Sequence, residues 1–236
     1  MSGTLYLIPV FLGESTPWLE VLPAATRETA CHLKHFVAEN AKTARAALKW
    51  LEHPMPIRDI AIEQLPEKPS LTDVERLLAP LLSDHDVGLM SEAGCPGVAD
   101  PGALLVRRAH ELDIQVRPMI GPSSLLLALM ASGLDGQRFA FHGYIPAREP
   151  ERSKRITELE KESRHKQQTQ LLIETPYRNT ALFDALLAAC QPQTLLCVAS
   201  DLSLQNESVI TRSVKQWRAA VKPLLDRRPT VFLLLA

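Results

Sequence analysis

The sequence predicts an α/β protein built from two α/β lobes with mostly parallel or mixed sheets. The chain of 236 residues is 46% apolar and 22% charged, which is enough to form one large or two small hydrophobic cores. Apolar runs rich in β-formers alternate with segments of helical periodicity, as in proteins whose strands and helices take turns along the chain. Loops of small residues follow several of the expected strands, at the strand ends where open α/β sheets bind their ligands.

The first expected lobe covers residues 1–114. In it we expect strands at Thr4–Val10, Phe36–Ala38 and Asp86–Met90, and helices at Ala41–Leu51, Thr72–Ser83 and Pro101–Leu112. The segment Pro54–Pro69 contains four prolines, so we expect a surface connection there rather than regular structure.

The second expected lobe covers residues 115–236, with the junction near Asp113–Val116. In it we expect strands at Gln115–Met119, Arg138–Phe141, Gln170–Ile173, Leu195–Ser200 and Thr230–Leu235, and helices at Ser123–Ser132, Pro150–Lys166, Arg178–Ala189 and Val214–Leu225.

Charge and composition exclude several classes of protein. The formal net charge is -1, so no global basic field indicates nucleic-acid binding and any RNA contact must be local. The four cysteines form no CxxC pair, and the Cys31, His32 and His35 group lacks a fourth local ligand; we therefore expect neither a metal site nor a disulfide framework. Without a signal sequence or a run of roughly 20 apolar residues, we expect a soluble, cytoplasmic protein with no membrane contact.

The most informative segment is the small-residue loop Met90–Gly102, which lies between an apolar strand and a helix. Such a loop lets backbone groups approach a ligand closely. A purely structural interpretation makes Asp100 the N-cap of the next helix, with Pro101 at its first position. The loop is nevertheless longer than a simple turn requires.

Two further loops follow the same pattern. In Met119–Ser124 a strand is followed by a turn with Gly121 and a proline, and then by two serines at the start of a helix. Capping of that helix explains only one of the serines, and exposed amides there could bind the polar end of a cofactor. In Leu172–Arg178 an apolar strand ends in a carboxylate, a proline and an arginine. Two interpretations are open: an adenine packs on the end of this strand, or the segment is a buried strand followed by a capped helix.

Together these motifs resemble those of the tetrapyrrole-methylase-like superfamily of S-adenosylmethionine-dependent methyltransferases. Within it, the sequence is most similar to the bacterial family of small-subunit ribosomal RNA 2′-O-ribose (cytidine) methyltransferase I. The matching segments, which span nearly the whole chain, are Gly3–Tyr6 with Pro9, Ser91–Gly102, Gly121–Ser124 with Ser132–Leu134, Phe139–Pro146 and Glu174–Arg178.

The resemblance implies a bilobal fold with S-adenosyl-L-methionine in the cleft between the lobes, and commonly a homodimer. By position in the matched motifs, the expected cofactor contacts are Pro9, Gly94, Cys95, Val98, Ser123, Ser124 and Ile173. Methyl transfer from a sulfonium is an in-line displacement, so alignment of donor and acceptor supplies much of the catalysis. A ribose hydroxyl would be helped by a base, for which Glu39 and Glu92 are candidates, while Lys42 would stabilise negative charge.

The sequence departs from the family pattern at several positions. Asn40 and Lys42 stand where the family has an aspartate and an arginine, Glu92 replaces an aspartate, and Ser200–Leu204 lacks the family's leading arginine and terminal lysine. Three functions therefore stay open: an RNA methyltransferase acting on the small ribosomal subunit, a methyltransferase for a small or tetrapyrrole-like molecule, and a non-catalytic paralogue that binds the cofactor.

The segment Arg148–Lys166 holds seven basic residues against five glutamates. It is interpreted either as a patch that contacts phosphates or, slightly favoured, as a solvated helix with charge pairs between successive turns. His142 is expected to be a packed strand residue.

Overall fold

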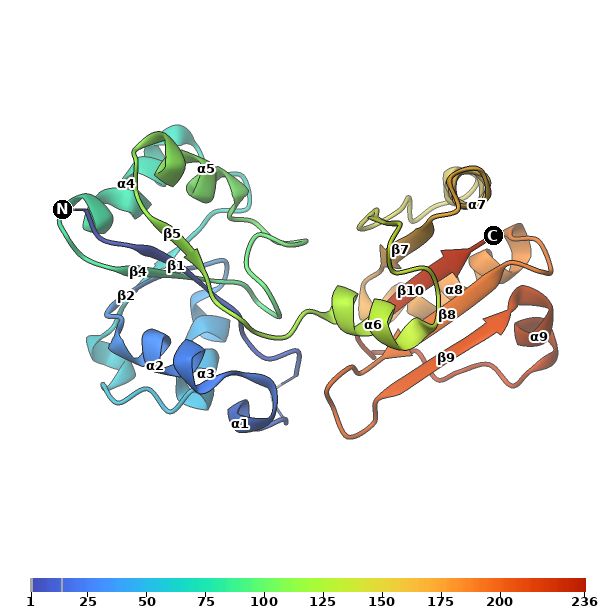
Figure 1. Ribbon diagram of the computed structural model, residues 1–236, viewed down its shortest axis with the longest axis horizontal. Coiled ribbons are helices and arrows are strands. Elements are labelled where there is room, and N and C mark those ends of the chain that lie inside the picture. Colours follow the sequence, from blue (N-terminus) through green and yellow to red (C-terminus); the bar gives the residue numbers. More distant parts are fainter. Residues whose placement is uncertain (1, 14) are drawn as a thin grey trace. The chain divides into compact units, whose positions relative to one another are not determined.

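The computed structural model describes residues 2–13 and 15–236, which form two compact units that divide after Ser123. Each unit contains one five-stranded sheet covered by helices, so the predicted α/β class with two sheets is confirmed (Figure 1). No helix among the described residues is long and apolar enough to cross a membrane.

The first unit is an all-parallel sheet with the strand order β3-β2-β4-β1-β5. Its strands are β1 (Leu5–Ile8), β2 (His35–Ala38), β3 (Ala61–Gln64), β4 (Val87–Met90) and β5 (Val116–Pro118). Its helices are α1 (Trp18–Val21), α2 (Ala24–His32), α3 (Ala41–Trp50), α4 (Leu71–Leu82) and α5 (Ala103–Glu111), with a short 3-10 turn at Ile57–Asp59.

Both faces of this sheet are buried. Along β2, Phe36 and Ala38 pack into the core formed with α2 and α3, whereas Val37 points into the core formed with α4 and α5. This alternation follows from the two-residue period of a strand, and it explains why the strands are apolar throughout. Helices α2 and α3 accordingly lie on one side of the sheet and α4 and α5 on the other (Figure 1).

The order of the strands creates a topological switch point between β1 and β4. From β1 the chain continues through α2 to β2 on one side, whereas from β4 it continues through α5 to β5 on the other. Open α/β sheets bind ligands in the crevice beyond the carboxyl ends of the strands at such a point. The loops that begin at Pro9 and at Ser91 leave the sheet there.

The second unit has a mixed sheet with the strand order β6-β7-β10-β8-β9, in which β6 pairs with β7 in parallel and the other neighbouring strands pair antiparallel. Its strands are β6 (Phe139–Phe141), β7 (Thr169–Ile173), β8 (Leu195–Ser200), β9 (Ser208–Ser213) and β10 (Thr230–Leu235). Its helices are α6 (Ser124–Ser132), α7 (Glu151–Lys166), α8 (Asn179–Ala189) and α9 (Val214–Ala219), with a 3-10 turn at Pro176–Arg178.

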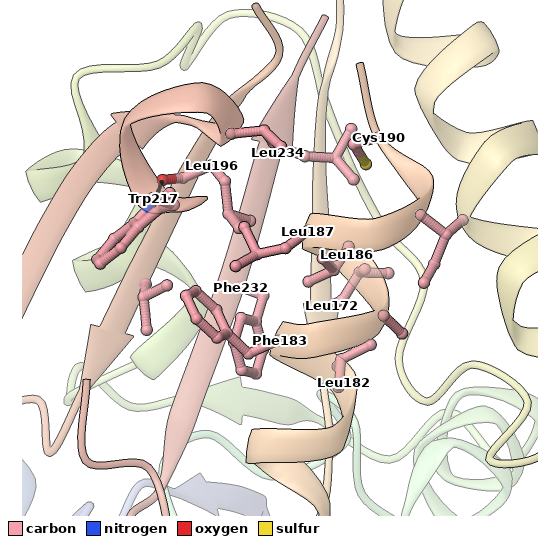
Figure 2. Packing of buried hydrophobic residues seen from close by; sticks show 14 of the residues in the cluster. Leu172, Leu182, Phe183, Leu186, Leu187, Cys190, Leu196, Trp217, Phe232 and Leu234 are labelled. Atoms are coloured by element: carbon pink, nitrogen blue, oxygen red, sulfur yellow. Dashed lines mark hydrogen bonds between the residues drawn. The ribbon is translucent and has the colours of Figure 1, made fainter. Parts of the chain in front are cut away.

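The core of the second unit lies between this sheet and helices α7, α8 and α9. Figure 2 shows Phe183 of α8 and Phe232 of β10 packed beside Leu186 and Leu172. Trp217 of α9 packs edge-on against Phe183, with the two ring centroids 5.4 Å apart. The indole nitrogen of Trp217 donates a hydrogen bond of 2.8 Å to the carbonyl of Leu196, so its only polar atom is satisfied in a dry core.

The structure differs from the sequence-based expectations in several elements. Within 54–69, expected to be irregular, β3 pairs with β2 through a parallel ladder despite the flanking prolines, because the prolines lie outside the paired residues. Strand β9 and helices α1 and α2 were not predicted. The units divide after Ser123 rather than after residue 114, because β5 pairs with β1 and so belongs to the first sheet.

Helix α5 corrects the interpretation of Asp100. The helix begins at Ala103, and its N-cap is Gly102, which adopts a φ of 132° that favours glycine. Asp100 therefore does not cap this helix, and its carboxylate is available for another role. Segment 148–166 forms α7 and its approach, where ion pairs join Arg152 to Glu149 and Arg155 to Glu158, three residues apart, and Lys166 to Glu162, four residues apart.

Candidate functional site

The loops after β1, β4 and β5 come together at the carboxyl edge of the first sheet. The amide of Val10 donates to the carbonyl of Gly94 at 2.9 Å, which ties the loop after β1 to the loop after β4. The Cys95 thiol lies 3.4 Å from the carbonyl oxygen of Pro122, which ties the loop after β4 to the loop after β5. The predicted residues Pro9, Gly94 and Cys95 are thus neighbours in space.

Two glycines allow this close approach. A Cβ on Gly121 would lie 2.4 Å from Cβ of Pro9, nearer than side-chain atoms tolerate, so only glycine lets these two loops touch. Gly94 adopts a φ of 70°, and Ser91, whose side chain is almost fully buried, donates to the carbonyl of Gly94 at 3.2 Å. The conformation of the turn at Gly94 is therefore held by a hydrogen bond within the loop itself.

Residues 97–99 of the loop after β4 are open to solvent. Val98 is 47% exposed, and a Cβ placed on Gly97 would meet nothing within 4 Å. On the loop after β5, Ile120 is 74% exposed. Exposed apolar side chains and bare backbone at one sheet edge suit a ligand with both an apolar body and polar ends.

Three carboxylates share this edge. Glu39 follows β2, Glu92 follows β4, and Asp100 lies later in the same loop. Burial and the nearby charges of Glu39 and Glu92 raise the pKa of Asp100 from 3.8 to about 6. Burial, and then the charges of Glu92 and Glu67, also raise the pKa of Glu39 above its ordinary value.

The two glutamates have different environments. One carboxylate oxygen of Glu39 is buried and has no hydrogen-bond partner among the described residues, whereas Glu92 is exposed and lies 3.4 Å from the hydroxyl of Thr43. Lys42, expected to stabilise negative charge, is exposed on the first turn of α3, and no ion pair joins it to a carboxylate in the described part of the chain. Asn40 caps that helix by accepting from the Lys42 amide at 2.9 Å.

Asp100 is the functional candidate that the sequence analysis set aside as a cap. Its pKa near 6 would leave it largely ionised at neutral pH yet basic enough to accept a proton, which is the range suited to a general base. The loop length of Met90–Gly102 was the available signal, because a simple capped turn needs fewer residues.

The remaining predicted contacts lie elsewhere in the chain. Ser123 ends the first unit and Ser124 is the first residue of α6, both half-buried. In the second unit Ile173 is the last residue of β7, and its amide donates to the carbonyl of Gly143 at 3.1 Å. The next residue, Glu174, has a side chain only 4% exposed and accepts from Arg178 at 2.7 Å.

No group of three or more histidine, cysteine or acidic side chains in residues 2–13 and 15–236 is arranged to hold a metal ion. Near the group considered in the sequence, the Cys31 thiol lies 3.8 Å from the carbonyl oxygen of Leu51 and the His32 ring bonds the carbonyl of Glu28 at 2.6 Å.

Comparison with known proteins gives a consistent result. The family model of tetrapyrrole (corrin/porphyrin) methylases matches residues 20–217. Proteins named ribosomal RNA small subunit methyltransferase I are 40% identical over 177 residues in Pseudomonas aeruginosa, covering 75% of this chain and 58% of the relative, and 32% identical over 164 residues in Xylella fastidiosa, covering 70% and 59%. The chain thus spans less than two thirds of the length of these two relatives.

The solved structure of a diphthine synthase superposes with a TM-score of 0.65 at 15% identity, covering all of this chain and 90% of that one, which shows a shared fold alone. The doubly wound first sheet, the mixed second sheet and a family match over most of the residues lead to one conclusion: this chain belongs to the tetrapyrrole (corrin/porphyrin) methylase family.

Proposed function

We propose that this protein transfers the methyl group of S-adenosyl-L-methionine to RNA of the small ribosomal subunit, at a ribose 2′-oxygen. The observation that carries the proposal is the carboxyl edge of the first sheet, where glycine-dependent loop contacts meet at the switch point and Asp100 has a pKa of about 6. The names of the relatives support an RNA acceptor.

The residues present fit this cofactor. Val98 and Ile120 offer apolar surface, and the open space beside Gly97 leaves the backbone accessible. Glu39, Glu92 and Asp100 give the edge a negative potential that favours a cationic sulfonium. When bound, the cofactor supplies an electrophilic methyl group.

The chain's own residues would then prepare the acceptor. The carboxylate of Asp100 accepts the proton of the attacking hydroxyl, since the proton must leave as the new carbon–oxygen bond forms. Burial, and then the neighbouring charges of Glu39 and Glu92, raise the pKa of that carboxyl and so keep the carboxylate basic enough to do so. The fixed loops hold donor and acceptor in line, which lowers the entropic cost of the displacement.

Calorimetric titration with S-adenosylmethionine and S-adenosylhomocysteine tests the cofactor site. We expect the wild type to bind and a Gly94→Val variant to lose binding, since its φ of 70° strains a β-branched residue and the Cβ would press on Leu12 at 3.3 Å. Circular dichroism checks that the variant folds. Equal affinity of both proteins would refute this placement of the cofactor.

A small or tetrapyrrole-like acceptor is the second candidate, favoured by the family model itself. Transfer of a labelled methyl group to small-molecule extracts but not to ribosomal subunits would support it. Cofactor binding without transfer to any acceptor would support a non-catalytic paralogue. A homodimer and a cytoplasmic location also belong to the proposal; light scattering of the purified protein tests the former.

A further inference from the structure

The second unit carries positive charge that the whole-chain value conceals. Residues 124–236 contain 15 lysines and arginines against 11 aspartates and glutamates, a formal charge of +4, while residues 1–123 contain 11 against 16, a charge of −5. A polyanion is therefore attracted to the second unit and repelled by the first.

At one end of the second sheet, arginines lie around an exposed aromatic ring. The turn after β7 carries Tyr177 and Arg178, and the turn before the antiparallel strand β10 carries Arg227 and Arg228. Tyr177 is 76% exposed, and the guanidinium of Arg227 lies 6.0 Å from the centroid of its ring. The amide of Arg227 donates to the carbonyl of Pro176 at 3.2 Å, which holds the two turns together.

Buried carboxylates orient the other two arginines. Glu174, with 4% of its side chain exposed, accepts from Arg178 at 2.7 Å, and Asp201, with 10% exposed, accepts from Arg228 at 2.6 Å. Glu174 and Asp201 lie beneath their arginines, and the Arg178 side chain is 49% exposed, whereas Arg227, 78% exposed, lies 3.9 Å from the carboxylate of the equally exposed Asp226. Preoriented guanidinium groups suit phosphate contacts better than mobile lysines do.

The backbone at Arg227 is left-handed. Its φ of 59°, one of eight positive values among the described non-glycine residues, is disfavoured for a residue with a Cβ. This conformation is held by its own amide bond to Pro176 and by Arg228, which also donates to the carbonyls of Asn206 at 2.6 Å and Leu224 at 3.1 Å. Strained backbone that the surroundings enforce is a feature of ligand contacts.

We infer that Tyr177, Arg227 and Arg178 form a stacking site for an unpaired base of single-stranded RNA, with the arginines contacting the flanking phosphates. An exposed aromatic ring bordered by arginines is how proteins bind splayed-out bases, because every base has a face that stacks and every nucleotide carries a phosphate. The inference rests on the proposed function in taking RNA as the substrate, and it assigns RNA recognition to the second unit rather than to the acidic edge of the first.

Fluorescence anisotropy with a labelled single-stranded RNA of about ten nucleotides, at several salt concentrations, tests the site. Tyr177→Ala should weaken RNA binding roughly 5- to 100-fold with an unchanged salt dependence, since it removes stacking and no charge. Tyr177→Phe should bind within about twofold of the wild type, because the ring remains. Arg227→Ala should weaken binding and reduce the slope of log affinity against log salt by about one.

The charge-matched control is Arg58→Ala, whose side chain is 86% exposed in the first unit and which should leave RNA affinity unchanged. An RNA backbone without bases should bind the wild type and Tyr177→Ala with equal affinity. Cofactor affinity, measured by calorimetry on each variant, should stay constant.

Equal RNA affinity of the wild type and Tyr177→Ala would overturn the inference, as would a loss confined to cofactor affinity, which would assign the ring to the cofactor. If the wild type methylates RNA and Tyr177→Ala binds RNA as tightly as the wild type does, only this inference is overturned. Wild-type protein that binds RNA through Tyr177 but transfers no methyl group would overturn only the proposed function.

Discussion

Replacing Asp100 by asparagine should stabilise the protein at neutral pH. The carboxyl ionises near 3.8 in an unfolded chain but near 6 in the folded protein, because burial and the charges of Glu39 and Glu92 oppose its ionisation. The unfolded chain therefore loses this proton first as pH rises, and the free energy of unfolding falls between pH 4 and pH 6. Above about pH 6 the carboxyl is ionised in both states, and its charge lowers the free energy of unfolding by the full amount.

The size of the effect follows from the two pKa values. A rise from 3.8 to about 6 corresponds to at most about 3 kcal/mol. Solvent screening of this half-exposed carboxylate reduces the expected gain of Asp100→Asn to about 1–1.5 kcal/mol above pH 6.5. Below pH 4 the carboxyl is protonated in both states, so the gain should vanish.

Urea denaturation of the wild type and Asp100→Asn at pH 4, 5, 6, 7 and 8 measures this difference. Asp59→Asn, an exposed aspartate of the same unit with its side chain 51% exposed, is the matched control and should show no such pH dependence. A gain of equal size at pH 4 and pH 8, or a loss at pH 8, would refute the assignment of the carboxylate cluster.

Four further predictions follow from the geometry. The rate of methyl transfer should rise through about pH 6 and then level off, and Asp100→Asn should lower it about 100-fold or more at unchanged cofactor affinity; a retained profile would exclude Asp100 as the base. Gly121→Ala should destabilise the protein by about 1–3 kcal/mol in urea, because its Cβ would lie 2.4 Å from Pro9, whereas Gly136→Ala, with nothing within 4 Å, should be nearly neutral. S-adenosylhomocysteine should slow alkylation of Cys95 several-fold but not of the similarly half-buried Cys31, as read by mass spectrometry; equal protection would argue against the loop placement. Trp217→Phe should cost about 1–3 kcal/mol, since it leaves the Leu196 carbonyl without its donor and a gap beside Phe183; an unchanged denaturation midpoint would contradict the packing in Figure 2.

The sequence predicts most of the fold because the apolar periodicity is strong where both faces of an element are buried. Strands such as β4 and β8 are apolar almost throughout and were found within one or two residues of their observed limits. Strands β3 and β9 were missed because none of their residues is fully buried, and their sequences AIEQ and SVITRS include polar residues instead of forming an apolar run.

The candidate site was predicted in part. The motifs placed Gly94 and Cys95 in a loop at a strand end, whereas Pro9 was expected within the first strand; the structure ends β1 at Ile8 and ties the loop that begins at Pro9 to Gly94. The role of Asp100 was not apparent, because an aspartate before a proline has the same local sequence whether it caps a helix or is buried near Glu92 of its own loop and Glu39 after β2. The distinction depends partly on the charge of Glu39, a residue far away in the chain, which local patterns do not contain.

Methyl transfer to RNA can be measured directly on the isolated small ribosomal subunit. Small ribosomal subunits are incubated with the purified protein and S-adenosylmethionine carrying a labelled methyl group, and the RNA is digested and its nucleosides are separated by mass spectrometry. We expect the labelled methyl group on the ribose 2′-oxygen of cytidine, and we expect no label when the Gly94→Val variant replaces the wild type. Saturated cofactor binding with no labelled nucleoside, or label on a small-molecule acceptor instead, would contradict this expectation.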